Sequence, residues 1–241
     1  MIRVFIGYDS RETVAYNVLA HSINRHASAP VAVAPVMLSQ LEGVFRRDKN
    51  PLQSTEFSFS RFLVPWMCDY QGWAIFMDCD MLMRQDVAKL WALRDERYAV
   101  QVVKHVHVPK EEVKFLGAVQ TKFEKKNWSS VMLINCAKCK ALTPEFVNTA
   151  SGMELHQFKW LANDGLIGEL PSRWNHHIGE LPSRWNHLVA YDPHRTDASL
   201  LHYTIGGPWF KEYENTEYAD EWFAEKSRML STPVSKVAAA S

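Results

Sequence analysis

A short apolar run that ends in two carboxylates constrains this sequence more than any other feature. Residues 74–77 read Ala-Ile-Phe-Met, and Asp78, Cys79 and Asp80 follow them. Four consecutive apolar residues predict a short buried strand, and side chains two positions apart on an extended chain point the same way. Two neighbouring carboxylates need a counter-charge, which a hard cation such as Mg²⁺ or Mn²⁺ supplies. The alternative is a strand end where both acids face water.

The composition bounds the fold and removes one class of function. A chain of 241 residues, with 47% hydrophobic and 22% charged residues, is long enough for one domain with a full core. Lys plus Arg and Asp plus Glu both number 27, so the formal net charge is zero. Nucleic-acid binding is therefore not supported as the main activity.

The sequence predicts no membrane-spanning segment, because no run approaches the ~20 apolar residues that cross a bilayer. Met1 leads directly into the strand-like residues 2–6, so we expect no signal peptide. Cys136 and Cys139 form a C-x-x-C, but no second pair completes a zinc site, so helical spacing of two small apolar residues is favoured. We expect a cytoplasmic protein with reduced thiols, either free or peripheral to the inner membrane.

Alternating elements predict an α/β fold. Strands are expected over residues 2–6, 31–38, 74–77, 98–103, 128–135 and 200–202, and helices over 11–25, 54–65, 86–91, 137–142 and 218–230. Residues 42–53 and 104–126 are polar and are expected to be surface loops. We expect a single Rossmann-like domain over residues 1–230, with a mixed central sheet flanked by helices, and a frayed tail over 231–241.

Two stretches besides the acid pair can contact a ligand. Tyr8 and Asp9 follow the first strand, where ligands gather in α/β folds; they can stack on and hydrogen-bond a nucleoside, and a plain turn is an equally fair account. Arg61 lies among hydrophobic residues and either reaches an anion or pairs with an acid such as Glu56 or Asp69.

The second chemical stretch lies near the carboxyl end of the chain. A short apolar strand delivers His202, and a turn with Gly206 and Gly207 follows, walled by aromatic residues such as Trp209. Glycines at such a turn permit a close approach of the backbone to a ligand.

Ten residues, Ile-Gly-Glu-Leu-Pro-Ser-Arg-Trp-Asn-His, occur twice in tandem at 167–176 and 178–187. Two such short copies do not make a solenoid, which needs about three or more units. Deleting one copy leaves a continuous segment ahead of Leu188. We interpret the second copy as a duplication that is extruded as a loop, because surface insertions cost little loop entropy.

Taken together, these segments resemble the family 8 glycosyltransferases over most of the chain. They are, in order, Arg-Phe-Leu-Val-Pro at 61–65, the acid strand, Asp-Val-Ala-Lys-Leu-Trp at 86–91, Val-Met-Leu-Ile-Asn at 131–135, Leu-Pro-Ser-Arg-Trp-Asn in the repeat, and residues 202–209. The last four are similar to the family's D-L-x-x-L-W, V-M-L-I-N, L-P-x-x-W-N and H-x-x-G-x-x-K-P-W. The resemblance implies the A-type nucleotide-sugar-binding fold, with a donor-binding half over about 1–135 and an acceptor- and metal-closing half over about 136–230.

Three departures from the family's pattern indicate a divergent, bacterial-type branch. The family's Lys before Pro-Trp is Gly207 here, and its Asn-x-Gly before V-M-L-I-N is Trp-Ser-Ser at 128–130. Its D-Q-D segment has no clean match, and Gln157 and Asp164 are the nearest candidates for the catalytic residues.

The resemblance implies a metal-dependent hexosyltransferase. Asp78, Asp80 and His202 would bind Mn²⁺, or Mg²⁺, against the diphosphate of a UDP-sugar, and a neutral His nitrogen is an acceptable third ligand. The Lewis acid would stabilise the charge on the departing diphosphate. Retention of anomeric configuration is expected, with a glycan, lipid or protein as the acceptor. The expected donor contacts are Tyr8, Asp9, Arg61, Gly206, Gly207, Trp209 and Lys211.

Two other classes of protein fit part of the pattern. A haloacid-dehalogenase-type phosphatase also places D-x-D after an apolar strand, but it wants Thr or Val where Leu82 stands and gives no role to His202. A non-catalytic nucleotide-sugar-binding protein is the other alternative, because the family's Lys is missing.

Overall fold

The described part of the chain is organised around two sheets. The computed structural model describes residues 1–48, 53–105, 125, 127–163 and 178–231. The larger sheet has the strand order β2-β1-β3-β6-β5-β7, and the smaller sheet the order β4-β9-β8. Strand β1 runs parallel to β2 and β3, whereas β6 runs antiparallel to β3 and β5. The strands are β1 (Ile2–Gly7), β2 (Val31–Val36), β3 (Trp73–Met77), β4 (Met81–Met83), β5 (Val100–Val102), β6 (Val131–Asn135), β7 (Ile178–Glu180), β8 (His187–Leu188) and β9 (Leu200–His202). The predicted α/β class with a mixed central sheet is confirmed.

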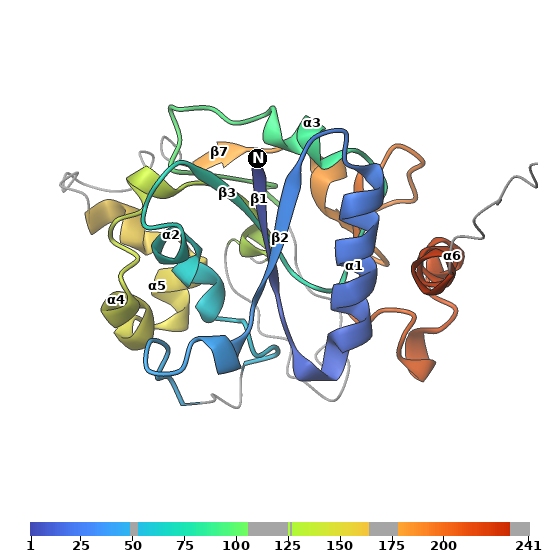
Figure 1. Cartoon of the computed structure of the whole chain (residues 1–241), viewed down its shortest axis with the longest axis horizontal. Coiled ribbons are helices and arrows are strands. Elements are labelled where there is room, and N and C mark those ends of the chain that lie inside the picture. The colour runs from blue at the N-terminus through green and yellow to red at the C-terminus, as the bar shows by residue number, and fades with distance from the viewer. Residues whose placement is uncertain (49–52, 106–124, 126, 164–177, 232–241) are drawn as a thin grey trace, which may run out of the picture.

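Helices flank the larger sheet (Figure 1). They are α1 (Thr13–His26), α2 (Val64–Met67), α3 (Val87–Trp91), α4 (Pro144–Thr149), α5 (Gly152–His156) and α6 (Ala219–Leu230). In this view α1 and α6 are neighbours on one side of β1 and β2, and α2, α4 and α5 lie on the other. Among these described helices, none has the length and apolar character that crossing a bilayer requires.

The central strands are buried throughout, which explains their unbroken apolar sequences. Every residue of β3 and of β6 is buried, and all of them except Asn135 belong to the main hydrophobic core. A second, smaller core lies among α1, α6 and the smaller sheet; its members are Val18, Leu82, Val189, Ala198, Leu201, Tyr203 and Trp222. The segment that joins β3 to β4 therefore leads from the larger sheet into the smaller one.

Most predicted elements are present with shifted ends. The helices expected over 11–25, 86–91 and 218–230 are α1, α3 and α6, and Asp86 caps α3 by accepting from the N–H of Ala88 (2.9 Å). The strand expected over 98–103 shortens to β5, and the one over 128–135 begins only after a 3-10 turn (Trp128–Ser130).

The helix predicted over residues 54–65 is largely wrong. The segment forms turns and a 3-10 helix (Ser60–Leu63) and becomes α-helical only in α2. The Ser58 hydroxyl donates to the carbonyl of Thr55 (2.8 Å), a local bond that competes with helix formation. The Phe57 ring packs against Gly7, where an added Cβ would lie 2.3 Å from it. Tertiary packing of this ring therefore overrides the helical pattern.

The helix predicted over residues 137–142 is also wrong. A 3-10 turn (Cys136–Lys138) stands there, and α4 begins at Pro144, the residue expected to stop a helix. Thr143 caps α4 by accepting from the N–H of Phe146 (3.1 Å). Pro is favoured at the first helical position because its missing N–H would have no intrahelical partner there.

The second copy of the repeat is built into both sheets, which corrects its interpretation as an extruded loop. Strand β7 pairs with β5 and β8 pairs with β9. Between them Trp185 and Asn186 are fully buried. Burial of the apolar part of the Trp185 ring favours this packed arrangement over an exposed loop. The first copy lies outside the described residues.

Deleting residues 167–177 should leave a folded protein of equal or higher melting temperature, because one copy suffices for β7 and β8. As a matched pair, Trp185→Ala should cost about 3–5 kcal/mol because a large buried ring is removed, and Trp174→Ala, the same change in the first copy, should cost much less. Urea unfolding measures both. Loss of the melting transition in the deletion, or equal losses in the two Trp variants, would contradict the redundancy.

Candidate functional site

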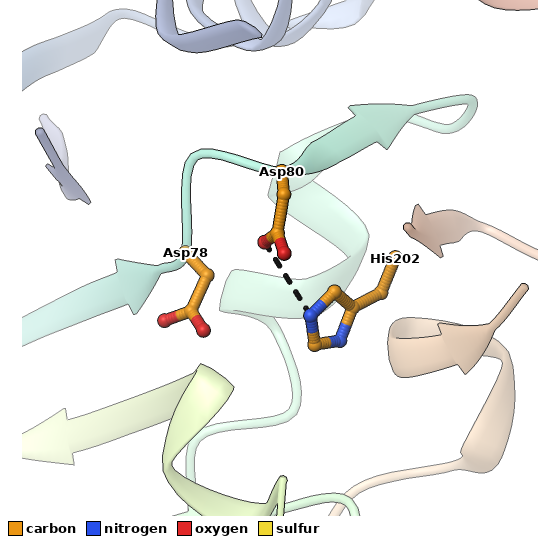
Figure 2. Close-up of side chains that lie close together, drawn as sticks. All are labelled: Asp78, Asp80 and His202. Atoms are coloured by element: carbon orange, nitrogen blue, oxygen red, sulfur yellow. Dashed lines mark ion pairs between the residues drawn. The ribbon is translucent and has the colours of Figure 1, made fainter. Parts of the chain in front are cut away.

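Asp78, Asp80 and His202 meet where the two sheets adjoin (Figure 2). Asp78 directly follows β3, Asp80 directly precedes β4, and His202 ends β9. Strands β4 and β9 pair with Met81 opposite His202, which brings the imidazole beside Asp80. One potential ligand atom from each of the three residues lies within 4.8 Å of the other two. The three side chains that the sequence analysis grouped together are therefore close in space.

Backbone hydrogen bonds hold residues 78–80, which we call the acid loop, to both sheets. The N–H of Asp78 donates to the carbonyl of Ser130, just before β6 (2.9 Å), and the carbonyl of Asp80 accepts from the N–H of Tyr203, just after β9 (2.9 Å). Because each acid is fixed by its own backbone, the carboxylates are positioned by the sheets rather than by a flexible loop.

The donor set fits a divalent cation. Asp78 and Asp80 are 14% and 13% exposed and His202 only 2%, so the ligand atoms lie at a mostly buried edge. His202 Nε2 lies 3.4 Å from Asp80 Oδ1. Carboxylate oxygens suit Mg²⁺ and Mn²⁺, and Mn²⁺ also accepts an imidazole nitrogen. Within the described ranges, these residues form the one such cluster of His, Cys, Asp or Glu.

Asn186 orients His202, a role that sequence reasoning missed. The Asn186 side chain is fully buried; its Nδ2 donates to Ser130 Oγ (2.9 Å) and to the carbonyl of Asn127 (3.3 Å). Its Oδ1 must therefore accept from His202 Nδ1, at 2.9 Å. This arrangement places a proton on Nδ1 and directs Nε2 toward Asp80. The available signal was the position of Asn186 in the Trp-Asn of the repeat.

Arg61 holds Asp78 in place. Its Nη1 donates to Asp78 Oδ1 (2.7 Å) and to the carbonyl of Ser129 (3.0 Å). The guanidinium carbon lies 5.1 Å from the ring centres of both Phe57 and Phe76. The side chain is 6% exposed, so the pair with Asp78 is shielded from water. Removing Arg61 would leave Asp78 without this counter-charge in a poorly solvated place.

Arg61 forms its ion pair with Asp78 and not with Glu56 or Asp69, the two acids that we considered as its partners. Glu56 accepts instead from the hydroxyl of Ser10 (2.6 Å), and Asp69 Oδ2 accepts from the side chain of Gln71 (3.2 Å). The alternative in which Arg61 pairs with either acid is therefore wrong. An acid of the predicted metal cluster takes that place.

Glu12 is a buried carboxyl that sequence analysis did not single out. It lies just before α1, is 1% exposed, and neither of its oxygens has a hydrogen-bond partner in the described part of the chain. Burial, and then the negative charges of Asp80 and Asp9, raise the pKa of Glu12 to about 9. Its carboxyl is therefore protonated at neutral pH and adds no negative charge beside the acid loop.

Tyr8 and Asp9 are held by their own neighbours at the end of β1. The Asp9 carboxylate accepts from the backbone and side chain of Arg11 (2.6–3.0 Å) and from the N–H of Glu56 (3.1 Å). Burial alone would raise the pKa of Asp9, but these hydrogen bonds hold it below its usual value. The Tyr8 hydroxyl pairs with Thr13 Oγ1 (2.8 Å). Both residues thus help to fix the turn that leads into α1.

Aromatic rings close the turn after β9. A Cβ added at Gly206 would lie 2.4 Å from the Tyr213 ring, and one at Gly207 would lie 2.0 Å from the Trp209 ring. No side chain fits at position 207 while Trp209 stays in place. Lys211 is exposed and supplies the next basic group along the chain.

Of the two candidate catalytic residues, the structure describes only Gln157. Gln157 follows α5 and is 7% exposed, and its carbonyl accepts from Lys125 Nζ (2.9 Å). Asp164 lies outside the described residues. Near Gln157, Ser129 Oγ contacts His156 Nδ1 (2.8 Å), so the Trp-Ser-Ser segment joins α5 to the Arg61–Asp78 pair.

One curated protein is close to this chain in sequence. No known family model matches the chain. Protein CDI of Arabidopsis thaliana is 48% identical to it over 227 residues, which are 92% of this chain and 85% of that protein.

Solved structures with the same architecture are glycosyltransferases. An active-site mutant of LgtC has a TM-score of 0.58 and 13% identity, over 97% of this chain and 98% of that one. The bifunctional WbbM has a TM-score of 0.58 and 14% identity, over 96% of this chain but 50% of its own. GlyE of Streptococcus pneumoniae TIGR4 has a TM-score of 0.54 and 15% identity, over 95% and 61%. At these identities the likeness establishes the glycosyltransferase A-type fold.

Glu12→Gln should flatten the pH dependence of stability. With a pKa of 4.5 unfolded and about 9 folded, the native state holds a proton that the unfolded state loses above pH 4.5. The wild-type free energy of unfolding should therefore fall as pH rises through this window, by at most about 1.4 kcal/mol per pH unit. Urea titrations from pH 5 to 9 measure this, with the exposed Glu145→Gln as control. Equal slopes in wild type and Glu12→Gln would refute the assignment.

Asn186→Ala should weaken Mn²⁺ binding by about 10- to 100-fold, the usual cost of losing a group that orients a ligating His. The matched control is Asn175→Ala, the same residue in the first copy of the repeat, which should bind as wild type does. Calorimetric titration of Mn²⁺ in the presence of UDP measures both. Wild-type affinity in Asn186→Ala would mean that His202 needs no such orientation.

Proposed function

Because the chain belongs to the family of Protein CDI of Arabidopsis thaliana and has the glycosyltransferase A-type fold, we propose that it is a metal-dependent glycosyltransferase. In this proposal it moves a hexosyl group from a UDP-sugar to a glycan, lipid or protein acceptor, with retention. The observation that carries the proposal is the cluster of Asp78, Asp80 and His202 where the two sheets meet. The order of family 8-like motifs along the chain supports the same class.

The cluster would hold Mn²⁺ or Mg²⁺. Two carboxylates and an imidazole nitrogen within 4.8 Å of one another are suitable donors. When bound there, the metal would supply Lewis-acid stabilisation of the charge on the departing diphosphate. Asn186 orients His202 for this role and Arg61 orients Asp78, so both act as positioning residues.

The chain's own cations complete the charge balance of the proposed donor site. A diphosphate carries more negative charge than one divalent cation cancels, and Gly207 brings no side chain. Arg61 is already paired with Asp78, so we assign the larger share of the remaining contact to the exposed Lys211. Tyr8 and Trp209 would contribute faces for the donor, and Asp9 would act by fixing the turn beneath it.

For the transfer itself, Gln157 is the described candidate. Its amide can hydrogen-bond a sugar hydroxyl or the acceptor but cannot take up a proton as a base. Its proposed role is therefore to orient the donor sugar. Asp164 remains a sequence-based candidate.

A non-catalytic nucleotide-sugar-binding protein is the second candidate, and one observation favours it. The Trp209 ring occupies the space that a Lys at position 207 would need. The phosphatase alternative loses support because the fold is that of glycosyltransferases.

Asp80→Asn should abolish Mn²⁺-dependent UDP binding and sugar transfer without unfolding the protein, because it removes a charged ligand and keeps the side-chain volume. Incubation with Mn²⁺ and a panel of UDP-sugars, followed by UDP release and calorimetry, measures both. Turnover in wild type supports the transferase, whereas metal-dependent binding without turnover supports the non-catalytic alternative. Unchanged binding in Asp80→Asn would overturn the metal site itself.

A further inference from the structure

A pocket of about 270 Å³ lies between α1, β4 and α6, away from the acid cluster. Three arginines and two glutamates line it: Arg25, Arg84, Arg228, Glu221 and Glu225. Leu82, Met83 and Ala224 also line it, and the first two are almost fully buried. The pocket therefore has one more arginine than it has glutamates, whereas the chain as a whole carries equal numbers of basic (Lys and Arg) and acidic residues.

The carboxylates of the pocket are already occupied. Buried Glu225 (1% exposed) accepts from Arg25 Nε (2.9 Å), from His21 Nδ1 (2.8 Å) and from Arg228 Nη1 (3.3 Å). Burial opposes its ionisation, yet the hydrogen bonds from Arg25 and His21 hold the pKa of Glu225 below its usual value. Glu221 forms an ion pair with Arg84, with 2.9 Å between Glu221 Oε2 and Arg84 Nε.

The guanidinium groups keep N–H donors that these acids do not use. In Arg84, Nε forms an ion pair with Glu221 and Nη1 donates to the carbonyl of Ala198 (3.0 Å), so Nη2 is left as a donor. Arg228 spends only Nη1, and Arg25 keeps Nη1, among the contacts of the described residues. Three cations with spare planar donors around one pocket match the oxygens of a tetrahedral dianion.

His26 also lines the pocket but adds no positive charge to it at neutral pH. His26 Nε2 contacts Arg25 Nη2 (2.6 Å), and burial, followed by the charge of Arg25, lowers the pKa of His26. It is therefore neutral at neutral pH and leaves the positive charge of the pocket to the arginines.

We propose that this pocket binds a phosphate group, either free or as a monoester. The inference goes beyond the proposed glycosyl transfer and does not depend on it. Leu82 and Met83, which line the pocket, belong to β4, the strand that begins directly after Asp80 and pairs with β9.

Inorganic phosphate should raise the melting temperature of the wild-type protein saturably, relative to chloride at equal ionic strength. Arg228→Gln, at a largely exposed position (57%), should need about tenfold more phosphate for the same shift, since a charge-assisted contact is lost. Arg84→Gln should behave alike. The control is Arg97→Gln, an exposed arginine that pairs with Asp95 outside the pocket, and it should respond as wild type does.

Further arms separate the sources of the phosphate and the two proposals. Glycerol 3-phosphate tests a soluble monoester, and vesicles with or without phosphatidic acid test a lipid headgroup; an Arg228-dependent response to any of these supports the site. Asp80→Asn should keep the phosphate response even if sugar transfer is lost. Absence of a saturable response to every probe, or equal responses in wild type and both pocket variants, would overturn the proposal.

Discussion

Crowded negative charge at the ends of β1 and β3 is the constraint on which the rest of this structure depends. Asp9, Glu12, Asp78 and Asp80 lie within one another's electrostatic influence in a place with little water. Like charges there would repel far more strongly than on the surface. The protein gives Asp9 and Asp78 an arginine each and leaves Glu12 protonated. Asp80 faces the imidazole of His202, with 3.4 Å between Asp80 Oδ1 and His202 Nε2.

Much of this fold could be predicted because its central strands are buried throughout. Such strands need unbroken apolar runs, and 74–77 and 131–135 can be recognised for that reason. The helix predicted over residues 54–65 was wrong because the spacing of the aromatic residues suits a helix equally well, whereas the packing of Phe57 on Gly7 favours turns. The prediction that a helix stops before Pro144 was wrong because a proline that breaks a helix can also begin one.

The candidate site could also be predicted only in part from the sequence. The acids and His202 could be grouped from the sequence because metal ligands are few in kind and their motifs are short. Asn186 and Glu12 could not, because their significance lies in contacts between distant parts of the chain. An asparagine in a turn and an acid near a helix start are ordinary surface residues until the fold buries them. The dependence of His202 on Asn186 also ties the candidate site to the repeated segment.

The packing of Trp209 against Gly207 has an evolutionary consequence. Where the resemblance places a lysine, the indole ring stands 2.0 Å from the position that a new Cβ would take. A single codon change at 207 would therefore meet a steric barrier before any phosphate contact could be gained. The Trp209 ring would have to move or be replaced at the same time. Positive charge near the turn is therefore gained more easily at another position than at position 207.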